Sequence, residues 1–268
     1  MSGADEHVVY YTHVMRRAIN IPEGEQGTLG SFAYGLSHNY YNALKKKQLY
    51  VNELYLSVVF SPEFVRTKRM FAGQKMSASQ EADERTAMEK MRSIALSLEE
   101  RLRQYGATRL STYNHKRSTF SALLEFYQYL INGEVKRFPL VKQNLQEVLL
   151  TSRTMFNFET GELRTPDNTI YVAALGMKTY PTSTFPGQFS VILGLPFEFV
   201  LTQSFASLTQ GAAREVLRKA SSRLSQTEHD ATSEIVEISG GGKGSALDDL
   251  AARRFILGVH HLVLLLKA

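Results

Sequence analysis

The sequence predicts an α+β fold, in which mixed or antiparallel sheets pack against helices. Hydrophobic residues make up 43% of the 268 residues and charged residues 21%, which is the balance of a globular chain with a sizeable core. Stretches in which apolar side chains alternate with polar ones indicate strands, and apolar side chains at every third or fourth position indicate helices. Both kinds of stretch are interleaved along the chain. The length favours one or two domains, and we expect two α/β sub-domains, residues 1–150 and residues 151–268.

The first sub-domain alternates strands and helices in the order β-α-β-α-β-α. In the strand predicted over residues 52–60, Leu54 and Leu56 share one face. Glu53 and Tyr55 share the opposite face. The predicted elements are strands at 8–17, 52–60 and 108–113, helices at 28–48, 80–105 and 118–132, and a short helix at 141–150.

Two glycines predict where helices of this sub-domain end. Gly106 follows the helix predicted over residues 80–105, and Gly133 follows the helix predicted over residues 118–132. Glycine is favoured just after the last helical turn because it adopts the left-handed conformation without a steric penalty.

The second sub-domain reads β-β-α-β-α-α-β and contains the longest predicted helix, residues 207–238. Ser207 is its expected N-cap, and apolar residues recur along it at helical spacing. At 1.5 Å per residue the helix would be roughly 48 Å long. The other predicted elements are a hairpin-like pair around 154–158 and Leu163, strands at 169–175, 197–205 and 255–267, a short helix beginning at Thr184 and a short helix at 245–253.

The positive charge of the chain is concentrated in its first sub-domain. Lys and Arg outnumber Asp and Glu by 31 to 26, a net charge of +5, and by 20 to 15 in residues 1–150, whereas residues 151–268 carry 11 of each. A basic surface attracts nucleic acid or anionic lipid, but an excess of this size is also common on a plain solvated surface. Six basic residues are candidate contacts to phosphate or to a partner: Arg101, Arg103, Arg109, His115, Lys116 and Arg117.

The sequence predicts no catalytic, cofactor-binding or metal-binding residue. The chain has no cysteine, which excludes disulfides, thiol nucleophiles and cysteine-based metal sites. The glycine-rich segment 240–245 does not fit the P-loop pattern, because Glu237 stands where the first glycine is required. His260 and His261 are neighbours in a predicted strand, so their side chains point to opposite faces and do not share a metal ion.

Nothing in the sequence predicts a membrane-spanning or secreted chain. The best apolar stretch, residues 255–266, is shorter than the roughly 20 residues that a spanning helix needs. The first residues lack a basic region followed by an apolar one, so we predict no secretory signal. We expect a cytoplasmic location.

One family combines segments that resemble those of this chain. The segment Leu195–Phe205, with the sequence LPFEFVLTQSF, resembles the strand before the long helix in the type IV secretion and conjugative-transfer ATPases of the CagE/TrbE/VirB type. Further segments resemble that family in the same order, so that the resemblance covers nearly the whole chain. They are Val9–Arg17, Asn52–Pro62, Leu123–Gly133, Tyr180–Pro186 and Asp248–Leu265.

The resemblance implies that the chain corresponds to the N-terminal, non-motor region of such an ATPase and contains no P-loop motor domain. The motor domain, with its phosphate loop and acidic magnesium-binding strand, would follow Ala268. We also expect the family's opening strands to be missing, so that the chain is a fragment, a split gene product or a truncated relative. ATP and Mg²⁺ would bind only in the absent motor domain, and we expect no ATP hydrolysis by this chain alone.

In that family the N-terminal region would serve as a docking and oligomerisation module. The implied partners are inner-membrane components of the secretion channel and further copies of the chain, at the cytoplasmic face of the bacterial inner membrane. The intact protein would energise assembly of the apparatus and export of DNA or protein. The alternative is a stand-alone nucleic-acid-binding module that uses the basic first half of the chain.

Overall fold

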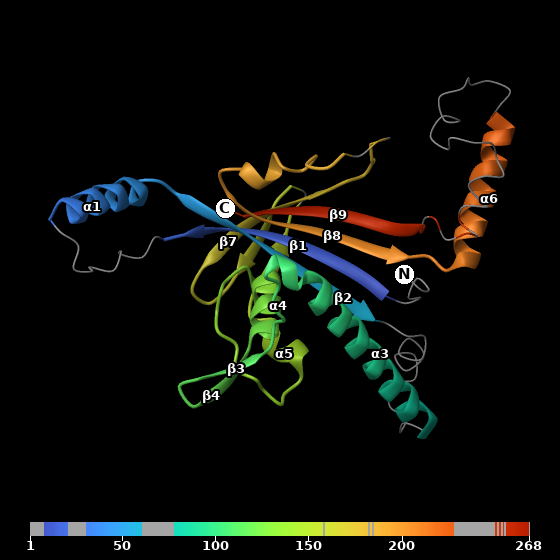
Figure 1. Ribbon diagram of the computed structural model, residues 1–268, viewed down its shortest axis with the longest axis horizontal. Helices are drawn as coiled ribbons and strands as arrows, with labels where there is room; N and C mark the ends of the chain where they lie inside the picture. The colour runs from blue at the N-terminus through green and yellow to red at the C-terminus, as the bar shows by residue number, and fades with distance from the viewer. Residues whose placement is uncertain are drawn as a thin grey trace. The chain divides into compact units, whose positions relative to one another are not determined.

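The protein has the predicted α+β class, with a seven-stranded sheet, a separate two-stranded sheet and packed helices. The structure is a computed structural model that describes residues 8–20, 31–60, 78–157, 159–181, 183, 185–227, 250, 252, 254 and 256–267. The strand order in the large sheet is β2-β1-β8-β9-β7-β6-β5, and Figure 1 shows β1, β8 and β9 running side by side. The pairs β5–β6, β6–β7 and β7–β9 are antiparallel.

The chain divides into two compact units, each discontinuous in sequence. Unit 1 comprises Met1–Tyr11, Leu56–Ala95 and Gln203–His261, and unit 2 comprises Thr12–Tyr55, Leu96–Thr202 and Leu262–Ala268. Each unit takes residues from both sides of position 150, and the division into sub-domains at that position stays a prediction.

The described part of unit 1 contains α6 (Gln210–Thr227), most of α3 (Ala78–Leu102) and segments of four strands. The predicted start of the long helix at Ser207 is wrong by three residues, because Ser207 ends β8 (Glu198–Ser207). The next residue is still held in extended pairing, since the Leu208 amide donates to the Leu257 carbonyl at 2.8 Å. Thr209 caps the helix instead, and its hydroxyl accepts from the Ala212 amide at 3.2 Å. Residues 228–238 of the predicted helix lie outside the described residues.

In unit 2 the central strands carry a core on both faces of the sheet. Val200 packs with Met15, Phe126 and Tyr129 on the face covered by α4 (Ala122–Asn132). Its neighbours on β8, Phe199 and Leu201, pack with Leu262 and Leu264 of β9 (Gly258–Lys267) in a second cluster. Successive side chains of a strand point to opposite faces, so the second cluster lies on the other side of the sheet. It is covered by the segment around η2 (Ile192–Gly194).

The edge strand β2 (Leu49–Phe60) turns its polar face inward within unit 2. Tyr55 packs against the α4-side core cluster, and Glu53 accepts two hydrogen bonds from the guanidinium of Arg17 on β1 (Val8–Ile19). Leu54 points the other way and is 73% exposed. The Arg17 guanidinium and the packing of Tyr55 both hold this face of the strand toward the core.

The segment predicted as one helix over 118–132 is a strand followed by a helix. Ser118–Ser121 forms β4, which pairs antiparallel with β3 (Thr112–His115) in a hairpin. The Ser121 hydroxyl accepts from the Leu124 amide and caps α4. The apolar spacing continues smoothly across this boundary, but cross-strand pairing with β3 takes the first four residues away from the helix.

Both predicted glycine helix ends are confirmed. Gly133 follows α4 with a φ of 77°, and Gly106 follows the 3₁₀ turn η1 (Arg103–Tyr105) with a φ of 70°. The remaining elements of unit 2 are close to their predicted places. They are α1 (Ser31–Lys45), α5 (Leu145–Leu149), β5 (Arg153–Phe156), β6 (Gly161–Arg164) and β7 (Thr169–Gly176).

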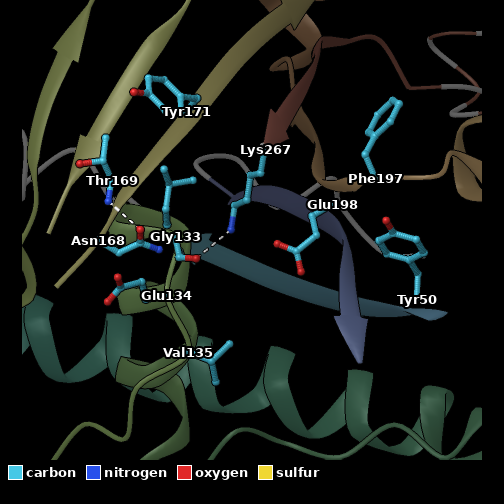
Figure 2. A pocket seen from close by; sticks show the side chains of 11 residues that line it. Tyr50, Gly133, Glu134, Val135, Asn168, Thr169, Tyr171, Phe197, Glu198 and Lys267 are labelled. Carbon is cyan, nitrogen blue, oxygen red and sulfur yellow. Dashed lines mark hydrogen bonds between the residues drawn. The ribbon is translucent and has the colours of Figure 1, made fainter. Parts of the chain in front are cut away.

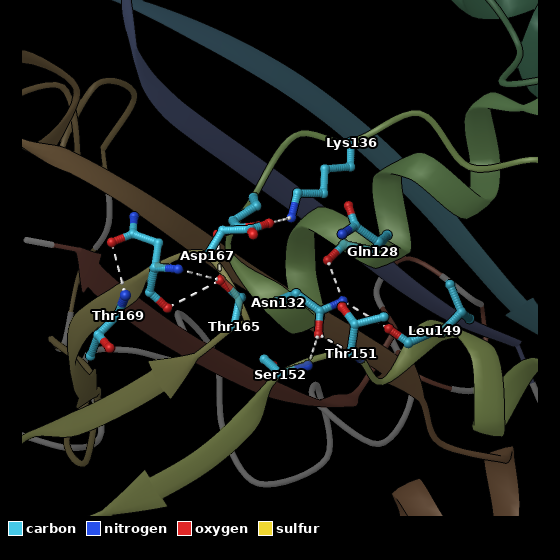
Figure 3. A network of polar contacts seen from close by, with 11 residues as sticks. Gln128, Asn132, Lys136, Leu149, Thr151, Ser152, Thr165, Asp167 and Thr169 are labelled. Carbon is cyan, nitrogen blue, oxygen red and sulfur yellow. Dashed lines mark hydrogen bonds and ion pairs between the residues drawn. The ribbon is translucent and has the colours of Figure 1, made fainter.

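The last residue of α4, Asn132, links α4 to α5 and to the connection that leads into β5, and it is fully buried (Figure 3). Its amide nitrogen donates to the carbonyl oxygens of Leu149 at 2.8 Å and Gln128 at 3.2 Å. Its carbonyl oxygen accepts from the amides of Ser152 at 2.9 Å and Thr151 at 3.1 Å. One side chain thus satisfies the backbone polar groups that lead from α5 into β5.

We expect Asn132→Ala to lower the free energy of unfolding by about 3 kcal/mol, because it leaves buried backbone amides and a carbonyl without partners. Urea denaturation of the chain measures this change. The exposed Asn39→Ala on α1 is the matched control and should shift stability by less than about 0.5 kcal/mol. Equal effects of the two substitutions would contradict the role given to Asn132.

Candidate functional site

The structure separates the six predicted basic contacts into two groups within unit 2. Arg101 and Arg103 lie at the carboxyl-terminal end of α3 and in η1, and Arg109 follows shortly after. His115, Lys116 and Arg117 lie at the tip of the β3–β4 hairpin, which Figure 1 draws away from the end of α3. Five of the six residues are exposed, and His115 is half-buried. The prediction of a phosphate or partner contact therefore applies to each group separately.

The hairpin tip presents its two cations from a strained turn. Lys116 and Arg117 have φ angles of 44° and 70°, which is the left-handed backbone that a two-residue hairpin loop requires and that favours Asn and Gly. Behind the tip, Tyr113 stacks on Phe120 with ring centroids 5.7 Å apart. The Tyr113 hydroxyl donates to Glu125 of α4 at 2.6 Å. The strands of the hairpin are thus anchored to α4, while the cations remain exposed.

The positive charge of the group near the end of α3, which is Arg101, Arg103 and Arg109, is partly neutralised. Arg109 lies 3.8 Å from a carboxylate oxygen of Glu99, and its side chain is 61% exposed. Exposed pairs of this kind contribute little to stability. They do reduce the positive potential that a phosphate group would meet.

Sequence reasoning missed a groove of about 860 Å³ in unit 2, which surrounds the end of β9 (Figure 2). At its centre Lys267 is only 6% exposed. Its ammonium group donates to the Gly133 carbonyl at 3.1 Å and lies 3.7 Å from the centre of the Tyr129 ring. Glu198 lies beside it in Figure 2 and accepts a hydrogen bond from the Ala18 amide at 2.7 Å. In the sequence, the only signal for this groove is one lysine, Lys267, at the end of an apolar strand.

Burial shifts the pKa values of ionisable side chains in and beside this groove. It lowers the pKa of Lys267 to about 8, although the negative charge of Glu198 partly opposes the change. Burial also raises the pKa of Tyr129 well above its usual range. At the rim, hydrogen bonds from Lys136 and Thr165 lower the pKa of Glu134.

The polar contacts in the groove hold two elements of the fold together. Two carboxylates, Glu134 and Glu198, face a single amine among its lining residues, so the lining does not favour an anionic ligand. The Lys267 amine is already engaged by the Gly133 carbonyl and the Tyr129 ring, which links the end of β9 to the end of α4. In the described part of the chain, no three His, Asp or Glu residues are grouped so that they could hold a metal ion.

Two apolar surfaces of unit 2 are open to a partner. Leu54 projects from β2, the first strand in the sheet order. On α1, the side chains of Phe32, Leu36 and Tyr40 are 84%, 64% and 61% exposed. None of the described helices combines the length and apolar character needed to cross a bilayer.

Residues 108–268, more than half of the chain, match the profile of the "CagE, TrbE, VirB family, component of type IV transporter system". The chain belongs to this family. It is 33% identical to the "Type IV secretion system protein virB4" of Bartonella henselae over 97% of this chain and 33% of that protein. It is 31% identical to the protein of the same name from Brucella suis over 88% of this chain and 29% of that protein.

A third relative, "Protein virB4" of Agrobacterium tumefaciens, is 29% identical over 99% of this chain and 33% of its own length. The chain therefore spans about a third of the length of the curated relatives that it matches. The family predicted from the separate segments is confirmed, and the chain is similar to components of type IV secretion systems.

We expect the stability of the wild-type chain to rise relative to Lys267→Met by about 1.5 kcal/mol between pH 8 and pH 9.5. The pKa of Lys267 is lowered to about 8 in the folded chain. Over this interval the unfolded chain keeps the proton that the folded chain releases, so rising pH relieves the burial penalty. Unfolding titrations of both proteins at several pH values measure the difference. The exposed Lys142→Met is the control, and a pH-independent difference for Lys267→Met would contradict the prediction.

We expect the double variant Lys116→Asn/Arg117→Gly to increase the free energy of unfolding by about 1 kcal/mol, because Asn-Gly fits the left-handed turn. The same variant removes both cations while preserving the hairpin, which makes it a clean probe of the nucleic-acid alternative. If the hairpin binds phosphates, the slope of log affinity for single-stranded DNA against log salt should fall by about 1.4. An unchanged slope, or no binding by the wild type at low salt, removes the hairpin from that alternative.

Proposed function

We propose that this chain is a docking and self-association region of a type IV secretion ATPase. Its partners are inner-membrane components of the secretion channel and further copies of itself, and it acts at the cytoplasmic face of the bacterial inner membrane. The observation that carries the proposal is the outward aliphatic surface of the edge strand β2, where Leu54 is 73% exposed.

The edge of β2 has few of the features that normally prevent strand pairing. Natural edge strands are protected by outward charges, prolines or bulges. Residues 49–60 contain no proline and one charged residue, Glu53. That residue is bound to Arg17 on the inner face. A partner strand or a second sheet can therefore approach this edge without burying an unpaired charge.

Membership of the family supports the proposal that this surface acts within a type IV secretion system. The relatives named above are type IV secretion system proteins, and their matched region corresponds to about a third of their length. In our proposal ATP and Mg²⁺ bind elsewhere in the longer protein, where they supply the energy for assembly of the apparatus and for export. This region contributes attachment to the channel and contact between subunits.

We expect Leu54→Lys to weaken self-association, and capture of detergent-solubilised channel subunits, by roughly tenfold or more. A lysine at the centre of an apolar contact would have to lose its hydration. Sedimentation velocity and pull-down of the chain measure the two effects. The substitution lies on an exposed position, so it should change the free energy of unfolding by less than about 0.5 kcal/mol.

The matched control is Leu140→Lys, which changes another leucine of unit 2 that is 55% exposed. It should leave both kinds of association intact. If the Leu54 and Leu140 variants behave alike, or if the wild-type chain is monomeric and captures no channel subunit, the proposal is wrong.

A further inference from the structure

The helix α1 has an apolar stripe with no partner among the described residues. Phe32, Leu36 and Tyr40 follow one another at intervals of four, so they lie on one side of the helix. They are 84%, 64% and 61% exposed. Within unit 2, α1 stands beyond the ends of β1 and β2 in Figure 1, and no other helix or strand of that unit lies against it. A stripe of this kind on an isolated helix indicates a contact surface.

The charge around this helix has one sign. Residues 26–52 contain no Asp or Glu, and Lys45, Lys46 and Lys47 follow one another at the end of α1. The three lysines line a groove of about 480 Å³ together with Ile19, Asn20, Leu44 and Gln48. The apolar stripe is therefore combined with a cationic end that has no acidic residue nearby in sequence.

We infer that α1 lies in the plane of an anionic lipid bilayer, with its apolar stripe among the acyl chains and the lysines at the phosphate groups. Aromatic and leucine side chains on one face with cations beside them are typical of interfacial helices. The helix has 15 residues, fewer than the roughly 20 that a spanning helix requires, so it fits a surface position. Clustered lysines add attraction to anionic headgroups.

Charge complementarity favours this occupant over a second copy of the chain. In a symmetric contact through α1, each copy would present Lys46 and Lys47 to the same two lysines of the other copy, and residues 26–52 contain no Asp or Glu. An anionic bilayer instead presents negative charge to these lysines. The inference deepens the proposed function by naming the partner of one surface, and it relies on that proposal only for the setting at the membrane.

Vesicle sedimentation tests the inference with the chain as it is. We expect it to bind vesicles of phosphatidylcholine with about one-third phosphatidylglycerol, and to bind pure phosphatidylcholine vesicles far more weakly. The triple variant Phe32→Ser/Leu36→Ser/Tyr40→Ser should lose binding by more than about tenfold. Lys46→Gln/Lys47→Gln should lose on the order of 25-fold, because each lysine contributes about fivefold. Leu140→Ser and Lys142→Gln are the matched controls.

Fluorescence gives a second readout that does not depend on the loss of a side chain. The chain has no tryptophan, so Phe32→Trp introduces a single reporter on the stripe. Its emission should shift to the blue when anionic vesicles are added, since the indole enters a less polar environment. Tyr105→Trp, at a position that is 76% exposed, should show no shift.

Two results would overturn the inference: the chain does not bind anionic vesicles, or the triple variant binds them as well as the wild-type chain does. If, in the second case, the triple variant also loses capture of channel subunits, the partner of α1 is a protein. Because Leu54→Lys changes a different surface, failure of the proposed docking at β2 and failure of lipid binding at α1 are distinguished.

Discussion

Two cations beside Tyr129 constrain how α4 packs on the sheet. Lys267 lies 3.7 Å from the centre of its ring, and the guanidinium carbon of Arg17 lies 5.8 Å from it. A cation removed from water is costly unless charge or hydrogen bonds compensate it. Here the compensation comes from separate elements, namely the Gly133 carbonyl after α4 and Glu53 on β2. Only a packing that brings these elements together satisfies both cations.

The end of α4 extends this constraint to the rest of unit 2. Gly133 supplies the carbonyl that Lys267 needs, and the residue before it, Asn132, satisfies the backbone that leads from α5 into β5. The carbonyl of Gly133, the residue that follows the last helical turn, holds a buried amine, so the helix end is an interaction site within the fold.

The buried face of β2 determines which of its side chains reach the surface. Glu53, bound to Arg17, and Tyr55, packed on the core, share the inner face of β2, so the aliphatic side chain of Leu54 between them points outward at the sheet edge. The apolar stripe of α1 is likewise left open. Neither surface is needed for the core clusters of unit 2, which are closed by α4 on one face and by the segment around η2 on the other. The exposed apolar side chains are therefore available for partners, which agrees with the attachment role that we propose.

The α+β class, most of the elements, both glycine helix ends and the family could be predicted from the sequence alone. These depend on local chemistry, namely side-chain periodicity, turn residues and short segments that keep their order. Three other features depend on how the elements pack: the hairpin that takes Ser118–Ser121 out of the predicted helix, the buried face of β2, and the Lys267 groove. Alternation shows that a strand has two faces but does not say which is buried. The Glu53 face is held inward by Arg17, 36 positions away in the chain, and by the core packing of Tyr55, and the amine of the buried Lys267 is bound to a carbonyl 134 positions away. Interactions between residues so distant in sequence leave no periodic signal, because they exist only once the elements have packed.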